Sequence, residues 1–166
     1  MITLREQLPD KEEYLSLFET TGWNAEYRAT ADDLARALAN SWFTISAYEG
    51  DRLVGFGRVA SDMVLHAIIY DMIVLPEYQG KGVGTMVLGR LLEKCRENGI
   101  NDVQLFCAKG KRSFYEKNGF DARPDDAPGM QLRLPQGLVR IDVADAGDES
   151  LIEQQRLEQA GARRNQ

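Results

Sequence analysis

The residues best suited to chemistry lie in a glycine-spaced turn at positions 79–85, which reads Gln-Gly-Lys-Gly-Val-Gly-Thr. Gly80, Gly82 and Gly84 leave the backbone uncovered by side chains, so its N–H groups can approach a ligand closely. A helix that begins at this turn would add the partial positive charge of its N-terminus. The turn therefore predicts an anion site, with phosphate as the best-suited ligand.

The spacing of this turn differs from two common phosphate-binding motifs. A P-loop needs Ser or Thr directly after its lysine to bind magnesium, but Lys81 is followed by Gly82. A dinucleotide-binding turn needs the spacing Gly-x-Gly-x-x-Gly and an acidic residue at the end of the next strand, whereas Asp102 begins that strand. Neither motif accounts for the turn.

Two elements position the turn: an apolar strand before it and an amphipathic helix after it. Residues 68–75 form an apolar run interrupted only by Tyr70 and Asp71. From Val83 onward apolar residues recur every three or four positions, and the helix is predicted to end at Gly99. A buried strand thus feeds a helix through an anion-binding turn.

Composition limits the class of protein. The chain has 166 residues, of which 43% are hydrophobic, so we expect one main domain with one core. The formal charge of −6 argues against a nucleic-acid-binding surface. No apolar run approaches twenty residues, and the first nine residues lack a hydrophobic signal, so we expect a cytoplasmic protein without membrane contact. Cys95 and Cys107 lie far apart, which predicts neither a disulfide framework nor a metal site.

The remaining patterns predict short strands with helices between them. Strands are expected at residues 3–8, 42–49, 53–60, 103–107 and 130–134, and helices after the caps Asp10 and Thr30 and at residues 111–118. The strand–helix–strand order around the glycine turn predicts a parallel crossover at the sheet centre. The connection 20–29 contains Trp23, which either forms a recognition surface or packs beneath the helices.

The C-terminal residues 136–166 are predicted to be an extension of a domain that spans residues 1–135. Residues 138–143 could add a strand, and residues 149–160 have the pattern of a charged helix. Such an extension could dock on the domain, contact a second subunit of a homodimer, or be loosely held.

Two motifs together resemble the GNAT superfamily of N-acetyltransferases. The pattern Gln79-x-x-Gly82-x-Gly84 after an apolar strand resembles that superfamily's coenzyme A pyrophosphate loop, and residues 115–120 resemble its Tyr-x-x-x-Gly-Phe segment. The stretch 71–80 is similar to a branch that includes plant arylalkylamine-type acetyltransferases. The resemblance implies an α/β (α+β) fold, with a mixed central sheet of about six to seven strands and about four flanking helices. It also implies a V-shaped splay between the two central parallel strands.

The resemblance further implies that acetyl-CoA is the cosubstrate and lies between the splayed strands. Backbone groups of Met72, Ile73 and Val74 would hold the pantetheine as an added strand would. The pyrophosphate would be held by the turn itself: Gln79, Gly80, Lys81, Gly82, Val83, Gly84 and Thr85. The N–H of Val74 would also stabilise the negative charge that develops on the thioester carbonyl when an amine attacks. Direct transfer would then need no covalent enzyme intermediate.

Two catalytic side chains are expected. Tyr115 matches the superfamily's general acid, which protonates the departing thiolate; the alternative is a tyrosine that only packs beside Phe114. Asp71 is a lone carboxylate in an apolar strand, where desolvation makes a carboxylate a better proton acceptor, so it is a candidate general base. Alternatively, Asp71 only hydrogen-bonds neighbouring backbone or orders the loop. Glu77, on a solvated turn, is a weaker candidate base.

The other reactive side chains are not expected to take part in the proton transfers. By strand alternation, His66 falls on the face opposite Asp71 unless a bulge intervenes. Cys107 is predicted to be a small buried residue. Three basic residues before Tyr115 either contact the extra phosphate of the nucleotide or form a solvated face: Lys109, Lys111 and Arg112.

The expected activity is transfer of an acetyl group directly from acetyl-CoA to a primary amine of a small molecule. Many relatives carry an asparagine seven residues before the tyrosine, where this chain has Ala108. The ribosomal-protein branch carries a glutamate base on the strand that ends near Cys107, and this chain has none there. The alternatives are an acyl-CoA-binding sensor, a protein or peptide N-acetyltransferase and a nicotinamide-dependent oxidoreductase.

Overall fold

The computed structural model describes residues 1–133 of the chain. The chain divides into two compact units, Met1–Gly129 and Met130–Gln166, and the first holds all the secondary structure described. No strand is present at residues 130–133, the described part of the strand expected at 130–134. The expected strand at 138–143 and helix at 149–160 lie outside the described residues, and the boundary at 135/136 stays a prediction.

The first unit is built on one mixed sheet with the strand order β1-β2-β3-β4-β5. Its strands are β1 (Ile2–Arg5), β2 (Phe43–Glu49), β3 (Arg52–Ser61), β4 (His66–Val74) and β5 (Asp102–Leu105). The first four are antiparallel neighbours, and β4 and β5 run parallel, which confirms the predicted crossover. Residues 1–133 thus supply five strands of the six or seven expected.

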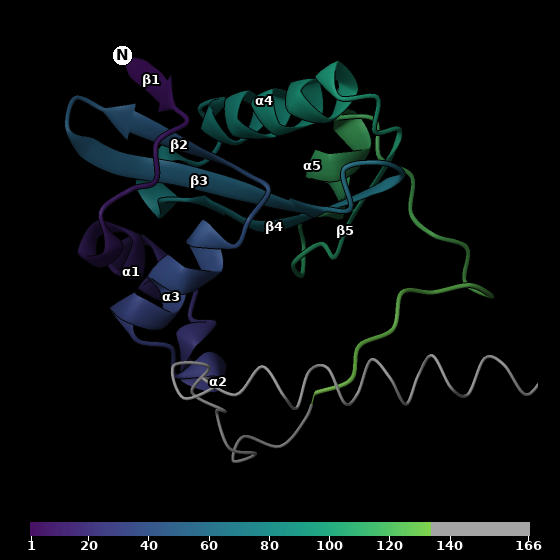
Figure 1. Cartoon of the computed structure of the whole chain (residues 1–166), viewed down its shortest axis with the longest axis horizontal. Helices are drawn as coiled ribbons and strands as arrows, with labels where there is room; N and C mark the ends of the chain where they lie inside the picture. The colour runs from purple at the N-terminus through teal and green to yellow at the C-terminus, as the bar shows by residue number, and fades with distance from the viewer. Residues whose placement is uncertain (134–166) are drawn as a thin grey trace, which may run out of the picture. The chain divides into compact units, whose positions relative to one another are not determined.

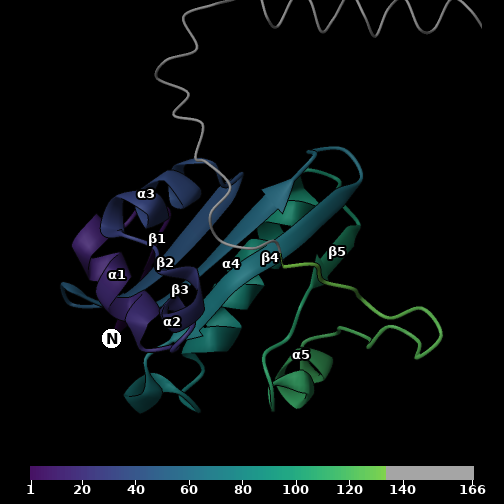
Figure 2. The same cartoon turned by 90° about the horizontal axis from the view of Figure 1, so that it is seen from below.

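Helices cover both faces of the sheet. They are α1 (Lys11–Glu19), α2 (Asn24–Tyr27), α3 (Ala31–Ala39), α4 (Val83–Glu97) and α5 (Arg112–Lys117), with a 3-10 turn at Pro76–Tyr78. Asp10 caps α1, and Thr30 with Asp33 forms a capping box at α3, as their spacing predicts. Figure 1 shows α4 on one face of the sheet and α1 with α3 on the other. Figure 2 shows the same arrangement from below.

The core lies between the sheet and these helices. On one side α4 buries Val87, Leu88 and Leu91 completely, and on the other side Tyr14 and Leu17 of α1 are buried. Trp23 is partly buried and packs edge-on against Phe18, which favours packing over recognition for this side chain. Among the helices described, none is long and apolar enough to cross a membrane.

Strand β4 contains a bulge at the position that interrupts its apolar run. Between the pairs Phe56↔Ile73 and Arg58↔Tyr70, β4 has one residue more than β3. Within the bulge Asp71 has a φ of 50°, a left-handed conformation that aspartate tolerates better than most residues. The extra residue brings two consecutive side chains of β4, those of Tyr70 and Asp71, to the face that carries Arg58.

The parallel pair β4–β5 is short. Pairing runs from His66↔Asp102 to Ile69↔Leu105, after which β4 continues alone to Val74. Because β5 itself ends at Leu105, the last residues of β4 have no strand partner on that side within the described residues, and this leaves the gap that the expected splay requires.

Candidate active site

The glycine turn leads directly into helix α4. Gly80 and Gly82 have φ values of 72° and 85°, and Gly82 is the N-cap residue of the helix. No side chain caps this end and no acidic residue lies in its first turn. The N–H groups of Val83, Gly84 and Thr85 have no acceptor within the helix, because the first turn of any α-helix lacks one. The turn thus fits an anionic group such as the pyrophosphate of coenzyme A.

Gln79, the first residue of the turn, joins three segments. Its Nε2 donates to the carbonyl oxygen of Val74 at 3.0 Å, and its Oε1 accepts from Nζ of Lys111 at 3.1 Å. The side chain therefore connects the end of β4 with the start of α5, across the point where β4 and β5 have parted.

The backbone of Val74 faces away from β3. Leu75 N–H donates to the carbonyl of Val54 at 2.9 Å, and in the register Gly55↔Val74 this makes Gly55 and Val74 a non-hydrogen-bonded pair. Val74 therefore presents its N–H and C=O on the side from which β5 has parted. The neighbouring Ile73 directs both groups to β3, so the geometry does not support its expected contact with pantetheine. The contacts of Met72 and Val74 stay predictions.

Tyr115 lies on α5 and is half-buried between two aromatic rings. The ring centroids of Phe114 and Phe120 lie 5.0 and 5.9 Å from that of Tyr115, both edge-on. Burial, with a smaller contribution from nearby Cys107, raises the pKa of the Tyr115 hydroxyl. The hydroxyl has no hydrogen-bond partner within residues 1–133. A hydroxyl that keeps its proton and has a free donor suits a general acid.

Helix α5 is attached to the glycine turn through Phe114. A Cβ atom added to Gly84 would lie 3.4 Å from the Phe114 ring, so the ring packs on the first turn of α4. The turn and the helix that carries Tyr115 are therefore in direct contact.

Asp71 is not the lone carboxylate that the sequence predicts. Arg58 Nε and the Tyr14 hydroxyl both donate to its Oδ2, and Arg58 Nη1 also donates to Ser41. The side chains of Arg58 and Asp71 are only 20% and 15% exposed, and Arg58 stacks on the Tyr70 ring. Burial, followed by the charge of Asp71, raises the pKa of Tyr14. This network ties the bulge of β4 to helix α1.

The structure also places three other side chains that the sequence suggested for the chemistry. Glu77 pairs with Arg52 at 2.6 Å, and its own backbone N–H and Arg52 lower the Glu77 pKa, which makes it a poor base. A bulge does intervene, which is the exception that the strand pattern allowed, so His66 shares the face of Tyr70 and Asp71; His66 is exposed and contacts Asp62. Cys107 is exposed, and the prediction that it is buried is wrong because β5 ends before it.

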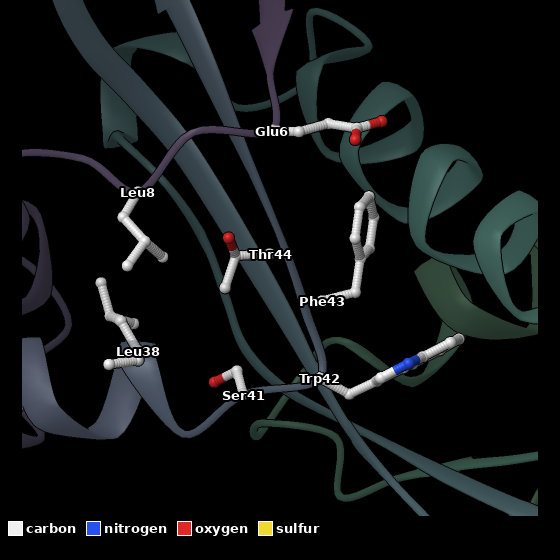
Figure 3. A pocket seen from close by; sticks show the side chains of 8 residues that line it. Glu6, Leu8, Leu38, Ser41, Trp42, Phe43 and Thr44 are labelled. Atoms are coloured by element: carbon white, nitrogen blue, oxygen red, sulfur yellow. The ribbon is translucent and has the colours of Figure 1, made fainter. Parts of the chain in front are cut away.

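A pocket of about 270 Å³ lies elsewhere, beside the start of β2 (Figure 3). Its lining comes from the segment after β1, the end of α3 and the start of β2: Glu6, Leu8, Leu38, Ala39, Ser41, Trp42, Phe43 and Thr44. None of the predicted site residues lines this pocket. Two of its lining residues are linked to Arg58: Ser41 accepts a hydrogen bond from it, and Thr44 is its register partner in β2.

Sequence reasoning missed the partners of two site residues. Arg58 and Tyr14 have no motif, and they reach Asp71 only because β3 and α1 pack against the bulge. The sequence held two signals for the bulge: an aspartate within an apolar strand, and Gly57 within the strand before it. The contact of Lys111 with Gln79 joins residues 32 positions apart and had no local signal.

Comparison with curated proteins places the chain among acetyltransferases. It is 33% identical over 118 residues to an uncharacterised N-acetyltransferase, ycf52, of Gracilaria tenuistipitata var. liui. Over 126 residues it is 32% identical to histone acetyltransferase TAP1 of Glycine max, and over 107 residues 36% identical to chloroplastic serotonin N-acetyltransferase 2 of Oryza sativa subsp. japonica. These matches cover 69%, 69% and 62% of the chain. The chain spans less than two thirds of these relatives, at 63%, 53% and 54% of their lengths.

The fold comparison agrees. The crystal structure of SA2161 from meticillin-resistant Staphylococcus aureus matches with a TM-score of 0.72 and 27% identity, covering 81% of this chain and all of that one. The family model of the acetyltransferase (GNAT) family matches residues 8–120, which include the glycine turn, the bulge and Tyr115. The chain therefore belongs to the GNAT family of acetyltransferases.

Proposed function

We propose that the protein transfers an acetyl group from acetyl-CoA directly to a primary amine of a small molecule. The observation that carries the proposal is strand β4, which parts from β5, turns the backbone of Val74 toward the gap and ends at an anion-binding turn. Acetyl-CoA supplies the activated acetyl thioester. The residues of the chain bind it, orient it and give a proton to the departing thiolate.

Each part of the site has a role in this reaction. The turn 79–85 holds the pyrophosphate by backbone N–H groups, and the C=O and N–H of Val74 align the pantetheine with β4. The N–H of Val74 stabilises charge on the thioester oxygen. Tyr115, whose raised pKa keeps it protonated, gives its proton to the departing thiolate.

The role of Asp71 is to fix the bulge. Its Oδ2 already accepts two hydrogen bonds, one of them from a guanidinium, so this oxygen is occupied by the contacts that hold the bulge. The proton of the amine then leaves by way of water. The general-base role predicted for Asp71 is the competing hypothesis.

Asp71→Asn separates these two hypotheses. If Asp71 fixes the bulge, the variant unfolds at lower denaturant concentration, and its kcat/KM keeps the pH profile of the parent. A loss of the pH-dependent rise in kcat/KM, with unchanged stability, would instead establish Asp71 as the base. Tyr14→Phe, which removes one donor to Asp71, is the matched control for the structural effect.

The acceptor class is inferred from charge and from the named activities of relatives. With a formal charge of −6, the protein attracts cationic amines more than anionic acceptors. The exposed Tyr70 ring beside Arg58 offers a flat surface to an aromatic amine. The rice relative is named for the arylalkylamine serotonin, which supports this class. The soybean relative named as a histone acetyltransferase favours a protein lysine as the second candidate.

Thiol release from acetyl-CoA tests the proposal. The panel should contain arylalkylamines, polyamines and lysine peptides, with each amine at several concentrations. We expect turnover with at least one small amine and a lower kcat/KM for the peptides. Coenzyme binding without turnover across the panel would favour an acyl-CoA sensor, and peptide preference would favour a protein acetyltransferase. Binding of a nicotinamide nucleotide instead of coenzyme A would indicate an oxidoreductase.

A further inference from the structure

A lysine from the far side of the splay reaches the glycine turn. Lys111 is the residue before helix α5, and its Nζ lies 3.1 Å from Oε1 of Gln79, the first residue of the turn. Gln79 in turn donates to the carbonyl of Val74. An ammonium group is therefore held at the first residue of the glycine turn, although it belongs to the segment that follows β5.

The neighbouring cations are oriented differently. Arg112 pairs with Glu116 on its own helix at 2.7 Å. Lys81 of the turn has its Nζ over the Tyr78 ring, 5.5 Å from the ring centroid. Of the basic residues 109–112, only Lys111 has a described hydrogen bond to the turn.

We propose that Lys111 binds the pyrophosphate of coenzyme A from the α5 side and so closes the site around it. The backbone N–H groups of α4 supply one side of the anion site, and the ammonium of Lys111 supplies the other. Gln79 holds Lys111 at this place in the free protein. When the ammonium turns from Gln79 to the phosphate, only Oε1 of Gln79 loses its partner, and Nε2 can keep its hydrogen bond to the Val74 carbonyl. The inference rests on the function proposed above.

The proposed contact between Lys111 and the pyrophosphate also positions the general acid, Tyr115. Tyr115 follows Lys111 by one helical turn, and the N–H of Tyr115 lies 3.4 Å from the Lys111 carbonyl. A phosphate that fixes Lys111 thereby fixes the start of α5 and the place of Tyr115. Binding energy from the nucleotide end of the coenzyme, which does not react, then helps to hold Tyr115 in place at the thioester. Lys111 is in this sense a positioning residue for the proton transfer as well as a binding residue.

Lys111→Met tests the binding role by equilibrium titration, which needs no turnover. The matched control is Lys109→Met, which removes the same charge two residues away. We expect the Kd of coenzyme A to rise roughly five- to tenfold in Lys111→Met and less than twofold in Lys109→Met. Dephospho-coenzyme A should show the same rise, because it keeps the pyrophosphate, and pantetheine should show none.

Two binding results would overturn the proposal. If the effect disappears with dephospho-coenzyme A, Lys111 contacts the 3′-phosphate instead. If pantetheine binding weakens as much as coenzyme A binding, Lys111 acts only through the structure of the free protein. Both results are independent of the acetyl-transfer hypothesis, because they measure coenzyme binding alone.

Kinetics with an active acceptor tests the positioning role. With acetyl-CoA, Lys111→Met should lower kcat as well as raise KM, whereas with S-acetylpantetheine the parent and the variant should have equal kcat and KM. A change in KM alone would leave Lys111 a binding residue and would contradict the link to Tyr115. Absence of turnover in the parent protein would contradict the proposed function, but the measured change in the Kd of coenzyme A would still stand.

Discussion

One half of the described structure comprises the antiparallel strands and α4, and the other comprises β5 and α5. The two halves differ in how tightly they are packed. Strand β3 pairs with neighbours on both sides, and its residues Val54, Phe56 and Val59 are fully buried. Strand β5 pairs with β4 over four positions, and within residues 1–133 neither β5 nor α5 has a buried residue. Figure 2 shows α4 behind the antiparallel strands and α5 below β5 in the view.

This difference matches the parts of the proposed site that each half carries. The closely packed half carries the bulge, the backbone of Val74 and the start of α4, which all need fixed positions. The other half carries Tyr115 and Lys111, whose positions depend on few contacts within the described chain. Sites that assemble around a ligand are drawn from regions of low local stability. The cosubstrate, bound between the halves, would supply the contacts that β5 lacks.

Hydrogen exchange gives the largest expected effect. In the free protein, amides of β5 and α5 should exchange faster than those of β3. At an acetyl-CoA concentration of about 100 times Kd, any opening that releases the ligand becomes about 2.7 kcal/mol less favourable, so exchange in β5 and α5 should slow by up to about a hundredfold. Mass spectrometry of short peptides would measure both rates. Equal protection of β3 and β5 in the free protein would contradict the inferred difference in local stability between the two halves.

A pair of glycine substitutions compares packing inside the closely packed half with packing at the contact between α4 and α5. A Cβ atom at Gly57 of β3 would lie 2.8 to 2.9 Å from side-chain atoms of Met72, Leu91 and Val87, whereas at Gly84 the nearest atom is 3.4 Å away. Gly57→Ala should therefore lower the free energy of unfolding by about 1–3 kcal/mol. Gly84→Ala, which gains helix propensity, should leave it unchanged or raise it slightly. Urea titration would measure both, and equal losses would show that the two sites are equally crowded.

Tyr115→Phe removes the proposed proton donor without changing the ring. We expect kcat to fall roughly tenfold or more, in line with general acid contributions, while the Kd of coenzyme A stays the same. Phe114→Leu is a control for packing, because it disturbs the contact with α4 but keeps the hydroxyl of Tyr115. An unchanged kcat in Tyr115→Phe would remove this residue from the mechanism.

The pH dependence follows from the same residue. Because burial raises the pKa of Tyr115 above the ordinary value of about 10, the acid form persists throughout the range in which the acceptor amine loses its proton. The rate should rise from neutral pH toward pH 10 without a descending limb. A fall of kcat between pH 8 and 9 would indicate that the group giving the proton has a lower pKa.

Ser46 in β2 gives the smallest expected effect. Its hydroxyl is the one buried side-chain polar atom that lacks a hydrogen-bond partner in the described part of the chain. Ser46→Ala removes an unsatisfied polar group from the packed half, so the free energy of unfolding should stay equal or rise by up to about 1 kcal/mol. Urea titration would again measure it. A clear loss of stability would show that the hydroxyl has a partner in solution.

Local patterns in the sequence predicted the elements that carry local signals. The caps Asp10 and Thr30, the strands expected at 42–49 and 53–60, the glycine turn and helix α4 all formed close to where they were expected. The prediction that the turn binds phosphate rests on glycine spacing and a helix start, which act within a few residues. The expected final strand failed in its described residues, because alternation of Met130 and Leu132 does not by itself supply a partner strand.

The sequence by itself therefore determined the family, the anion-binding turn and the candidate acid, because each depends on residue types at short, fixed spacing. Only the tertiary structure decided the state of Asp71, since its partners Arg58 and Tyr14 lie 13 and 57 positions away. The same holds for Lys111 and Gln79, which meet across the parting of β4 and β5. Contacts of this kind depend on strand register and helix packing, and a linear pattern carries neither.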